Sequence, residues 1–130
     1  MRSRFLATVL VLALTPSVAV AADGSVDMED MDITTTRDLY NLCAAKPNDP
    51  LVLEAAFLCL GFVAGVVNYH TAVTKPGTEP MSCAPAGTTR QQFVDKFVAW
   101  GQANDANAEL MSELAVNGMA RTAMEAWPCK

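Results

Sequence analysis

The stretch that decides the fold is residues 51–73, LVLEAAFLCLGFVAGVVNYHTAV, in which Glu54 is the one charged residue. A segment that is apolar on nearly every side predicts a helix buried over most of its surface, where Gly61 and Gly65 would let a neighbouring helix approach closely. A membrane-spanning helix that packs through the same glycines is the competing interpretation. The apolar part, residues 51–67, is 17 residues long, contains Glu54 and lacks basic flanks, so a buried central helix is favoured.

A shorter helix is predicted before this segment. Thr35 and Asp38 have the spacing of a capping box, and the apolar positions that follow share one helical face. Lys46 and Pro47 end this helix, because proline lacks the backbone N–H that a continuing helix needs.

Two further helices are predicted after it. Thr88 or Thr89 caps a third helix that ends at residues 101–104, and a fourth is expected from about Asp105 to Trp127. The fourth carries a polar stripe with a spacing of four residues, made of Glu109, Glu113, Asn117, Arg121 and Glu125. No segment alternates as a strand does, so the sequence predicts an all-α domain over residues 34–130, a compact bundle of four helices around the buried central one.

The connection between the second and third helices is unusually long. Residues 74–87, TKPGTEPMSCAPAG, contain three prolines and two glycines and have no helical or strand pattern. Connections of this length are uncommon unless they are functional or tied down, and Cys83 is positioned to supply such a tie.

The first 33 residues are predicted to lie outside the domain. Residues 1–21 have basic residues, an apolar run and an Ala-Val-Ala cleavage site, the pattern of a Sec-type signal peptide, which predicts a periplasmic or secreted protein without membrane insertion after cleavage. Residues 22–33 carry five acidic and no basic residues and are expected to be a flexible acidic lead-in.

Composition and charge exclude several classes of protein. A chain of 130 residues is too short for a multidomain enzyme, and 52% apolar residues exclude a disordered chain. Removal of residues 1–21 leaves 14 acidic against seven basic residues, a net charge of −7, which argues against a nucleic-acid binder and suits a basic partner.

The four cysteines predict two disulfides. Their number is even, and a short exported chain reaches an oxidising compartment in which cysteines pair. Four buried free thiols are the alternative. Chain reversal selects the pairing: antiparallel third and fourth helices bring Cys83 toward Cys129, which leaves Cys43 with Cys59 across the turn at residues 47–50.

Motifs of catalysis and cofactor binding are missing from the sequence. It has no GxSxG, P-loop, HExxH, CxxC or CxxCH motif, and His70 is its single imidazole. The expectation is therefore a protein that is not an enzyme, with no catalytic residues, cofactor or metal site.

Several short motifs together resemble one family. They are Leu39-Tyr-Asn-Leu-Cys43, Cys59-Leu-Gly-Phe-Val-Ala-Gly65, Cys83-Ala-Pro85 with Thr88-Thr-Arg-Gln-Gln-Phe93, and Ala126-Trp-Pro-Cys129. In order and spacing they resemble the Rap/Tai immunity proteins, small exported helical proteins associated with type VI secretion. The likeness spans residues 36–129; Phe62 stands where the family often has tyrosine.

The resemblance implies a non-enzymatic inhibitor that binds a toxic cell-wall amidase in the periplasm and blocks its active-site cleft; some members act as homodimers. Candidate contact residues are those expected to be exposed on the long connection or on the acidic stripe, namely Lys75, Glu79, Met81, Glu109 and Glu113. A periplasmic acid-stress chaperone, and a structural adaptor with the same scaffold, are the alternatives left open by the 14 acidic residues and by the rule that fold does not determine function.

Overall fold

A computed structural model describes residues 25–130, so the predicted signal segment, residues 1–21, lies outside the described part of the chain. The elements in chain order are η1 (Asp30–Asp32), a 3₁₀-helix, and the α-helices α1 (Thr36–Cys43), α2 (Val52–Val73), α3 (Arg90–Asn104), α4 (Ala108–Ser112) and α5 (Ala115–Ala126). Over the described range, one isolated β-bridge is the extent of strand pairing. The predicted all-α class is confirmed.

The helices begin where the sequence places their caps. Thr35 and Asp38 form the predicted capping box of α1, in which each side chain accepts a hydrogen bond from the other residue's backbone N–H. Of the two threonines considered for α3, Thr89 is the cap, and it forms a second capping box with Gln92. These local hydrogen bonds satisfy N–H groups that the first helical turn leaves without a partner.

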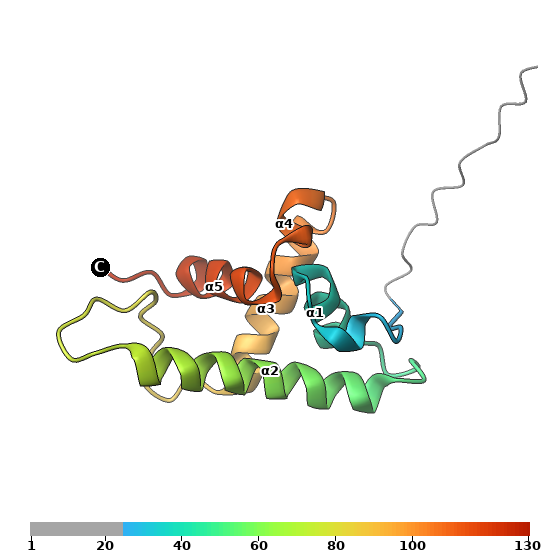
Figure 1. Ribbon diagram of the computed structural model, residues 1–130, viewed down its shortest axis with the longest axis horizontal. Helices are drawn as coiled ribbons and strands as arrows, with labels where there is room; N and C mark the ends of the chain where they lie inside the picture. The colour runs from blue at the N-terminus through green and yellow to red at the C-terminus, as the bar shows by residue number, and fades with distance from the viewer. Residues whose placement is uncertain (1–24) are drawn as a thin grey trace, which may run out of the picture.

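The helices surround one core. In Figure 1, α2 runs along the lower edge of the molecule, α1 and α5 lie above it, and α3 crosses behind. Contacts join α1 to α2, α3 and α5, and join α3 to α2 and α5. The largest fully buried apolar side chains are Leu39 and Leu42 of α1, Val63 of α2, Phe97 of α3 and Met119 of α5.

The central helix α2 is buried along one stripe only. Its buried residues are Ala55, Cys59 and Val63, and 17% of its most apolar 18-residue window is buried. The prediction of a helix covered on most sides is wrong. The helices that pack against α2 are α1, of 8 residues, and α3, which crosses it, and they cover one stripe of its 22 residues. By length and composition α2 could cross a membrane, yet Cys59 on its buried stripe is part of the hydrophobic core.

The glycines that permit close helix packing are not the predicted ones. A Cβ atom at Gly61 or Gly65 would meet no atom within 4 Å. At Gly101 it would meet the ring of Tyr40, and at Gly118 it would lie 2.5 Å from Cγ2 of Thr36. Helix α1 therefore approaches α3 and α5 closely, and the face of α2 that carries Gly61 is open.

The predicted fourth helix is two helices. Between α4 and α5 the backbone is extended and pairs with the residues that precede α1: the Thr36 N–H donates to the Glu113 carbonyl at 2.7 Å, and the Ala115 N–H donates to the Thr34 carbonyl at 3.2 Å. The Thr36 hydroxyl adds a 3.1 Å hydrogen bond to the Leu114 carbonyl. The prediction of a single helix over residues 105–127 is wrong, because the residues that pair with the extended segment lie far away in sequence and leave no mark in the local pattern.

The acidic lead-in, expected to be flexible, packs against the bundle in its described part, residues 25–33. Val26 is buried, and its N–H donates to an Asp49 carboxylate oxygen at 2.9 Å. Asp30 is buried and accepts hydrogen bonds from the Asp27 N–H and from the Asn41 amide, both at 2.9 Å. These buried contacts explain why the segment is ordered.

Both predicted disulfides are present. Cys43 of α1 is bonded to Cys59 of α2, and Cys83 of the long connection is bonded to Cys129 after α5, with Cα–Cα distances of 5.2 and 5.0 Å. The first lies in the core, and the second joins two segments that have no regular secondary structure.

Gly118→Ala should destabilise the fold. The added methyl group would collide with Thr36, which is fully buried and hydrogen-bonded, and overpacking should exceed the gain in helix propensity, for a net loss of about 1–2 kcal/mol. Urea denaturation at low protein concentration measures it. Gly61→Ala is the control and should stabilise by about 0.5–1 kcal/mol, because its surroundings are open. Equal shifts in both variants would contradict the packing described here.

Candidate partner-binding groove

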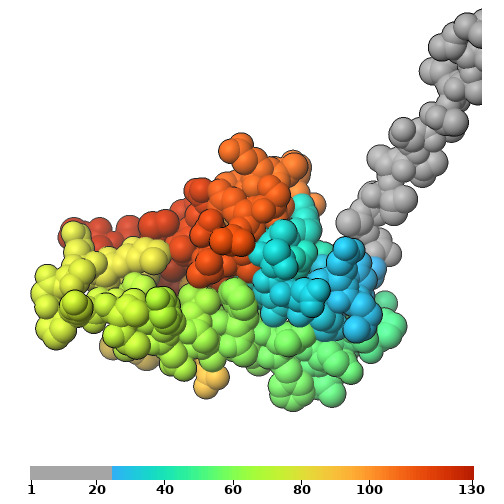
Figure 2. Space-filling model, viewed as in Figure 1, coloured from blue at the N-terminus to red at the C-terminus, as the bar shows by residue number. Residues whose placement is uncertain are grey.

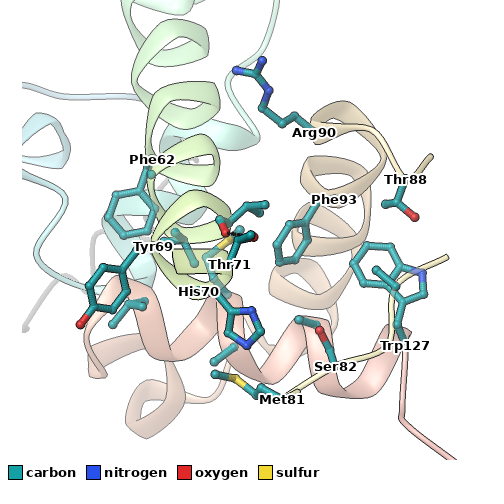
Figure 3. Close-up of a pocket in the computed structure, with 18 of the residues that line it drawn as sticks. Phe62, Tyr69, His70, Thr71, Met81, Ser82, Thr88, Arg90, Phe93 and Trp127 are labelled. Carbon is teal, nitrogen blue, oxygen red and sulfur yellow. Dashed lines mark hydrogen bonds between the residues drawn. The ribbon is translucent and has the colours of Figure 1, made fainter. Parts of the chain in front are cut away.

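A large apolar groove opens at the end of the molecule opposite α1. It has a volume of about 720 Å³ and lies between the second half of α2, the connection after it, the start of α3, and α5 (Figure 3). Four separate parts of the chain build its walls, so the groove exists only in the folded protein.

The lining of the groove is apolar and aromatic. Phe62 comes from α2, Phe93 from α3 and Val116 from α5, and Trp127 follows α5. The rings of Phe93 and Trp127 meet edge to face with centroids 5.3 Å apart, a favourable arrangement that holds this part of the wall. Binding to such a surface is favoured, because the free energy falls when a partner's apolar side chains displace water from it.

Polar groups are confined to a few lining residues: Tyr69, His70, Thr71, Ser82, Thr88, Thr89 and Arg90. The lining carries no carboxylate and no thiol. Figure 3 shows Arg90 in the upper part of the view, apart from His70 below it. Across residues 25–130, no group of three His, Cys, Asp or Glu side chains could hold a metal ion. The mainly apolar and aromatic lining suits binding of an apolar segment.

The long connection forms one wall and is tied at its middle. Met81, Ser82 and Ala84 face the groove, and the Cys83 N–H donates to the Trp127 carbonyl at 2.8 Å. Two positive-φ glycines, Gly77 at 84° and Gly87 at 87°, form the turns on either side, a conformation that other residues adopt only with strain.

The five predicted contact residues divide into two groups. Lys75, Glu79 and Met81 are all exposed on the connection, and Met81 lines the groove with 49% of its surface exposed. Glu109 and Glu113 lie in and after α4, and Figure 2 shows α4 and the connection on separate parts of the surface. The two groups are therefore distinct candidate contact areas.

Glu113 is already engaged within the chain. Both of its carboxylate oxygens accept hydrogen bonds from Arg121: Oε1 from Nη2 at 2.7 Å, and Oε2 from Nε at 2.8 Å. These bonds lower the pKa of Glu113 below its ordinary value, and they raise that of Arg121. Residues eight apart on one continuous helix would be about 12 Å apart along its axis, so this pair exists because the helix breaks at Leu114.

Sequence reasoning missed most of the groove. In the sequence, Phe62 stood out only as a departure from a motif, and Val116 and Ala120 carried no signal, although each lines the cavity. The Trp127-Pro-Cys129 motif signals that Trp127 belongs to a wall of fixed position, because the tryptophan lies two residues before a cysteine that forms a disulfide.

A comparison with protein families agrees with this architecture. The family model of the Rap1a immunity proteins matches residues 35–129, from the cap of α1 to the second cysteine of the Cys83–Cys129 bond. The chain belongs to the Rap1a immunity protein family. No curated protein and no solved structure matched it. Within residues 25–130, the match covers α1 to α5 and all of the groove of this Rap1a protein, and it confirms the resemblance expected from the motifs.

The lowered pKa of Glu113 should disappear when its partner is removed. In Arg121→Ala, an NMR titration of the Glu113 carboxyl should give a pKa close to that of a free glutamate, while Arg37→Ala, which removes the separate ion pair with Asp105, should leave it unchanged. Because the folded-state pKa is depressed, the pair stabilises the fold above the unfolded-state pKa, and this contribution is lost as pH falls through the folded-state value. An unshifted pKa in the unmodified protein would contradict the pairing.

Proposed function

We propose that this Rap1a protein is a non-enzymatic immunity protein that neutralises a secreted effector by binding it through the groove. Family membership supports the class of function, since immunity proteins act on a partner effector. The groove supports the mode of action: it is apolar and large enough for several side chains of a partner.

The walls of the groove are suited to binding at low entropic cost. The connection contains Pro76, Pro80 and Pro85, which restrict its backbone, and it is bonded to the C-terminal segment through Cys83. A loop held in its bound conformation loses little further freedom when the partner arrives. Lys75 and Glu79, exposed beside the groove, are positioned to contact the rim of the partner's surface.

The effector in this proposal is a peptidoglycan amidase delivered by a type VI secretion system, and its active-site cleft is the part that the connection blocks. This identity rests on the resemblance to the Rap/Tai proteins. The predicted signal segment and the disulfides agree with action in the periplasm, where disulfides form and cell-wall substrates lie. A net charge of −7 after removal of residues 1–21 would speed association with a basic amidase.

Met81→Glu should weaken capture of the amidase. A carboxylate in the apolar groove must lose its hydration without gaining a partner, so we expect the Kd to rise about tenfold or more, or about 1.4 kcal/mol. Met124→Glu is the matched control: this methionine is 43% exposed, close to the 49% of Met81, but lies outside the groove. Calorimetry with candidate periplasmic amidases measures both.

Absence of any stoichiometric complex with such amidases would remove the immunity function. A protein that instead keeps unfolded clients soluble at about pH 2–3 but not at pH 7 would be a chaperone.

A second copy of the chain is the other partner that we propose, and the outer face of α2 is its site. On this face, opposite the buried stripe, Leu53 and Phe57 are 63% and 69% exposed, followed by Gly61, Ala64 and Asn68 at intervals of three or four residues. In an antiparallel pair, the large side chains of one helix would lie against the smaller ones of its partner, and the uncrowded Gly61 would lie near the centre. Such a face is complementary to itself, as a two-fold interface requires.

Phe57→Glu should keep the protein monomeric, because two new carboxylates would be buried in the pair. Sedimentation velocity over a concentration series should show a dimer for the unmodified protein and a monomer for the variant. Tyr69→Glu changes a residue of similar exposure, 71%, that lines the groove, so it should preserve the dimer. A monomer for the unmodified protein at every concentration would exclude this pairing.

A further inference from the structure

The long connection is bonded to the C-terminal segment through one disulfide and the contacts around it. Between Lys75 and Gly87, hydrogen bonds such as Thr78 N–H to the Lys75 carbonyl are local turns. Three contacts link it to the C-terminal segment: the Cys83–Cys129 bond, the Cys83 N–H to Trp127 carbonyl hydrogen bond at 2.8 Å, and a 3.6 Å contact of the Cys129 sulfur with the Pro80 carbonyl. Every one of them involves Cys83 or Cys129.

This disulfide also joins two walls of the groove. Met81 and Ser82 lie immediately before Cys83, and Trp127 lies two residues before Cys129; all three line the cavity. Opening the bond would leave these walls joined by the Cys83–Trp127 backbone hydrogen bond and the weak Cys129–Pro80 contact. Both are open to competition from water, because Cys83 and Pro80 are exposed.

The two disulfides differ in their access to solvent. Cys83 is exposed and Cys129 is half-buried, whereas Cys43 is half-buried and Cys59 is 2% exposed within the core, so Cys83 is the one exposed cysteine of the four. Exchange begins when a thiolate attacks a disulfide sulfur, so the rate depends on whether a reductant reaches that sulfur. A dithiol should therefore open Cys83–Cys129 first and leave Cys43–Cys59 intact.

We infer that the Cys83–Cys129 disulfide is a redox switch for partner binding at the groove, a regulation that rests on the proposed function. A dithiol reductant transfers two electrons and two protons: the S–S bond breaks, Cys83 and Cys129 become thiols, and the dithiol becomes a cyclic disulfide. The connection is then released and the groove loses a wall. The core remains folded because Cys43–Cys59 still joins α1 to α2, and reoxidation restores the groove.

Partner binding is thereby limited to an oxidising compartment. A chain that has not yet been exported keeps its thiols reduced and its groove incomplete, and the groove forms when Cys83 and Cys129 are oxidised. The bond that stabilises the fold and the bond that makes it competent to bind are two different disulfides.

The test uses the full mature protein with increasing dithiothreitol, followed by alkylation and mass spectrometry, and by hydrogen–deuterium exchange. We expect Cys83 and Cys129 to be labelled before Cys43 and Cys59, with exchange at least tenfold faster in residues 75–89 and unchanged in α1 and in the first half of α2. Earlier labelling of Cys43 and Cys59, or unchanged exchange in residues 75–89, would overturn the switch.

Cys83→Ser/Cys129→Ser should reproduce the reduced state without reductant, and its α1 should stay protected because Cys43–Cys59 remains. Capture of the candidate amidase by this variant should fall at least tenfold. Undiminished capture would also overturn the switch. If oxidised unmodified protein fails to bind the amidase while the loop still responds to reductant, the proposed function fails and the conformational part of the switch stands.

Discussion

Thr36 is the residue on which the arrangement of the helices depends. It is the first residue of α1 and is fully buried against α5. Its backbone N–H and its hydroxyl both donate to carbonyls of the extended segment before α5, and its methyl group lies against Gly118. These contacts end α4, redirect the chain, and place α5 beside α1. Because α5 forms one wall of the groove, the site is a consequence of a contact made on the opposite side of that helix.

The other organising feature is the one-sided burial of α2. Ala55, Cys59 and Val63 supply its contribution to the core, and the rest of its surface is partly or fully exposed although it is apolar. An apolar helix that is exposed to water on one face retains hydrophobic free energy that only a partner can recover. In this protein the inner edge of α2 borders the groove and its outer face is free, so one helix serves two potential interfaces.

Groove and charge have separate roles in this molecule. The cavity is apolar, and several carboxylates make contacts within the chain: Glu113 pairs with Arg121, Glu125 accepts a hydrogen bond from the Trp100 indole, and Asp30 holds the N-terminal segment. In the complex that we propose, apolar contacts in the groove supply the affinity, and the net negative charge acts at long range on the rate of association.

The sequence by itself determined the local and covalent features: the capping boxes at Thr35 and Thr89, the helical class, the pairing of the four cysteines and the family. Each depends on residues close together in the chain or on simple chain reversal. Only the tertiary structure decided that α2 is exposed, that the last helix breaks at Leu114, and that Phe62, Val116 and Trp127 share a cavity. Periodicity reports which residues share a helical face, but whether that face is covered depends on the length and position of distant helices.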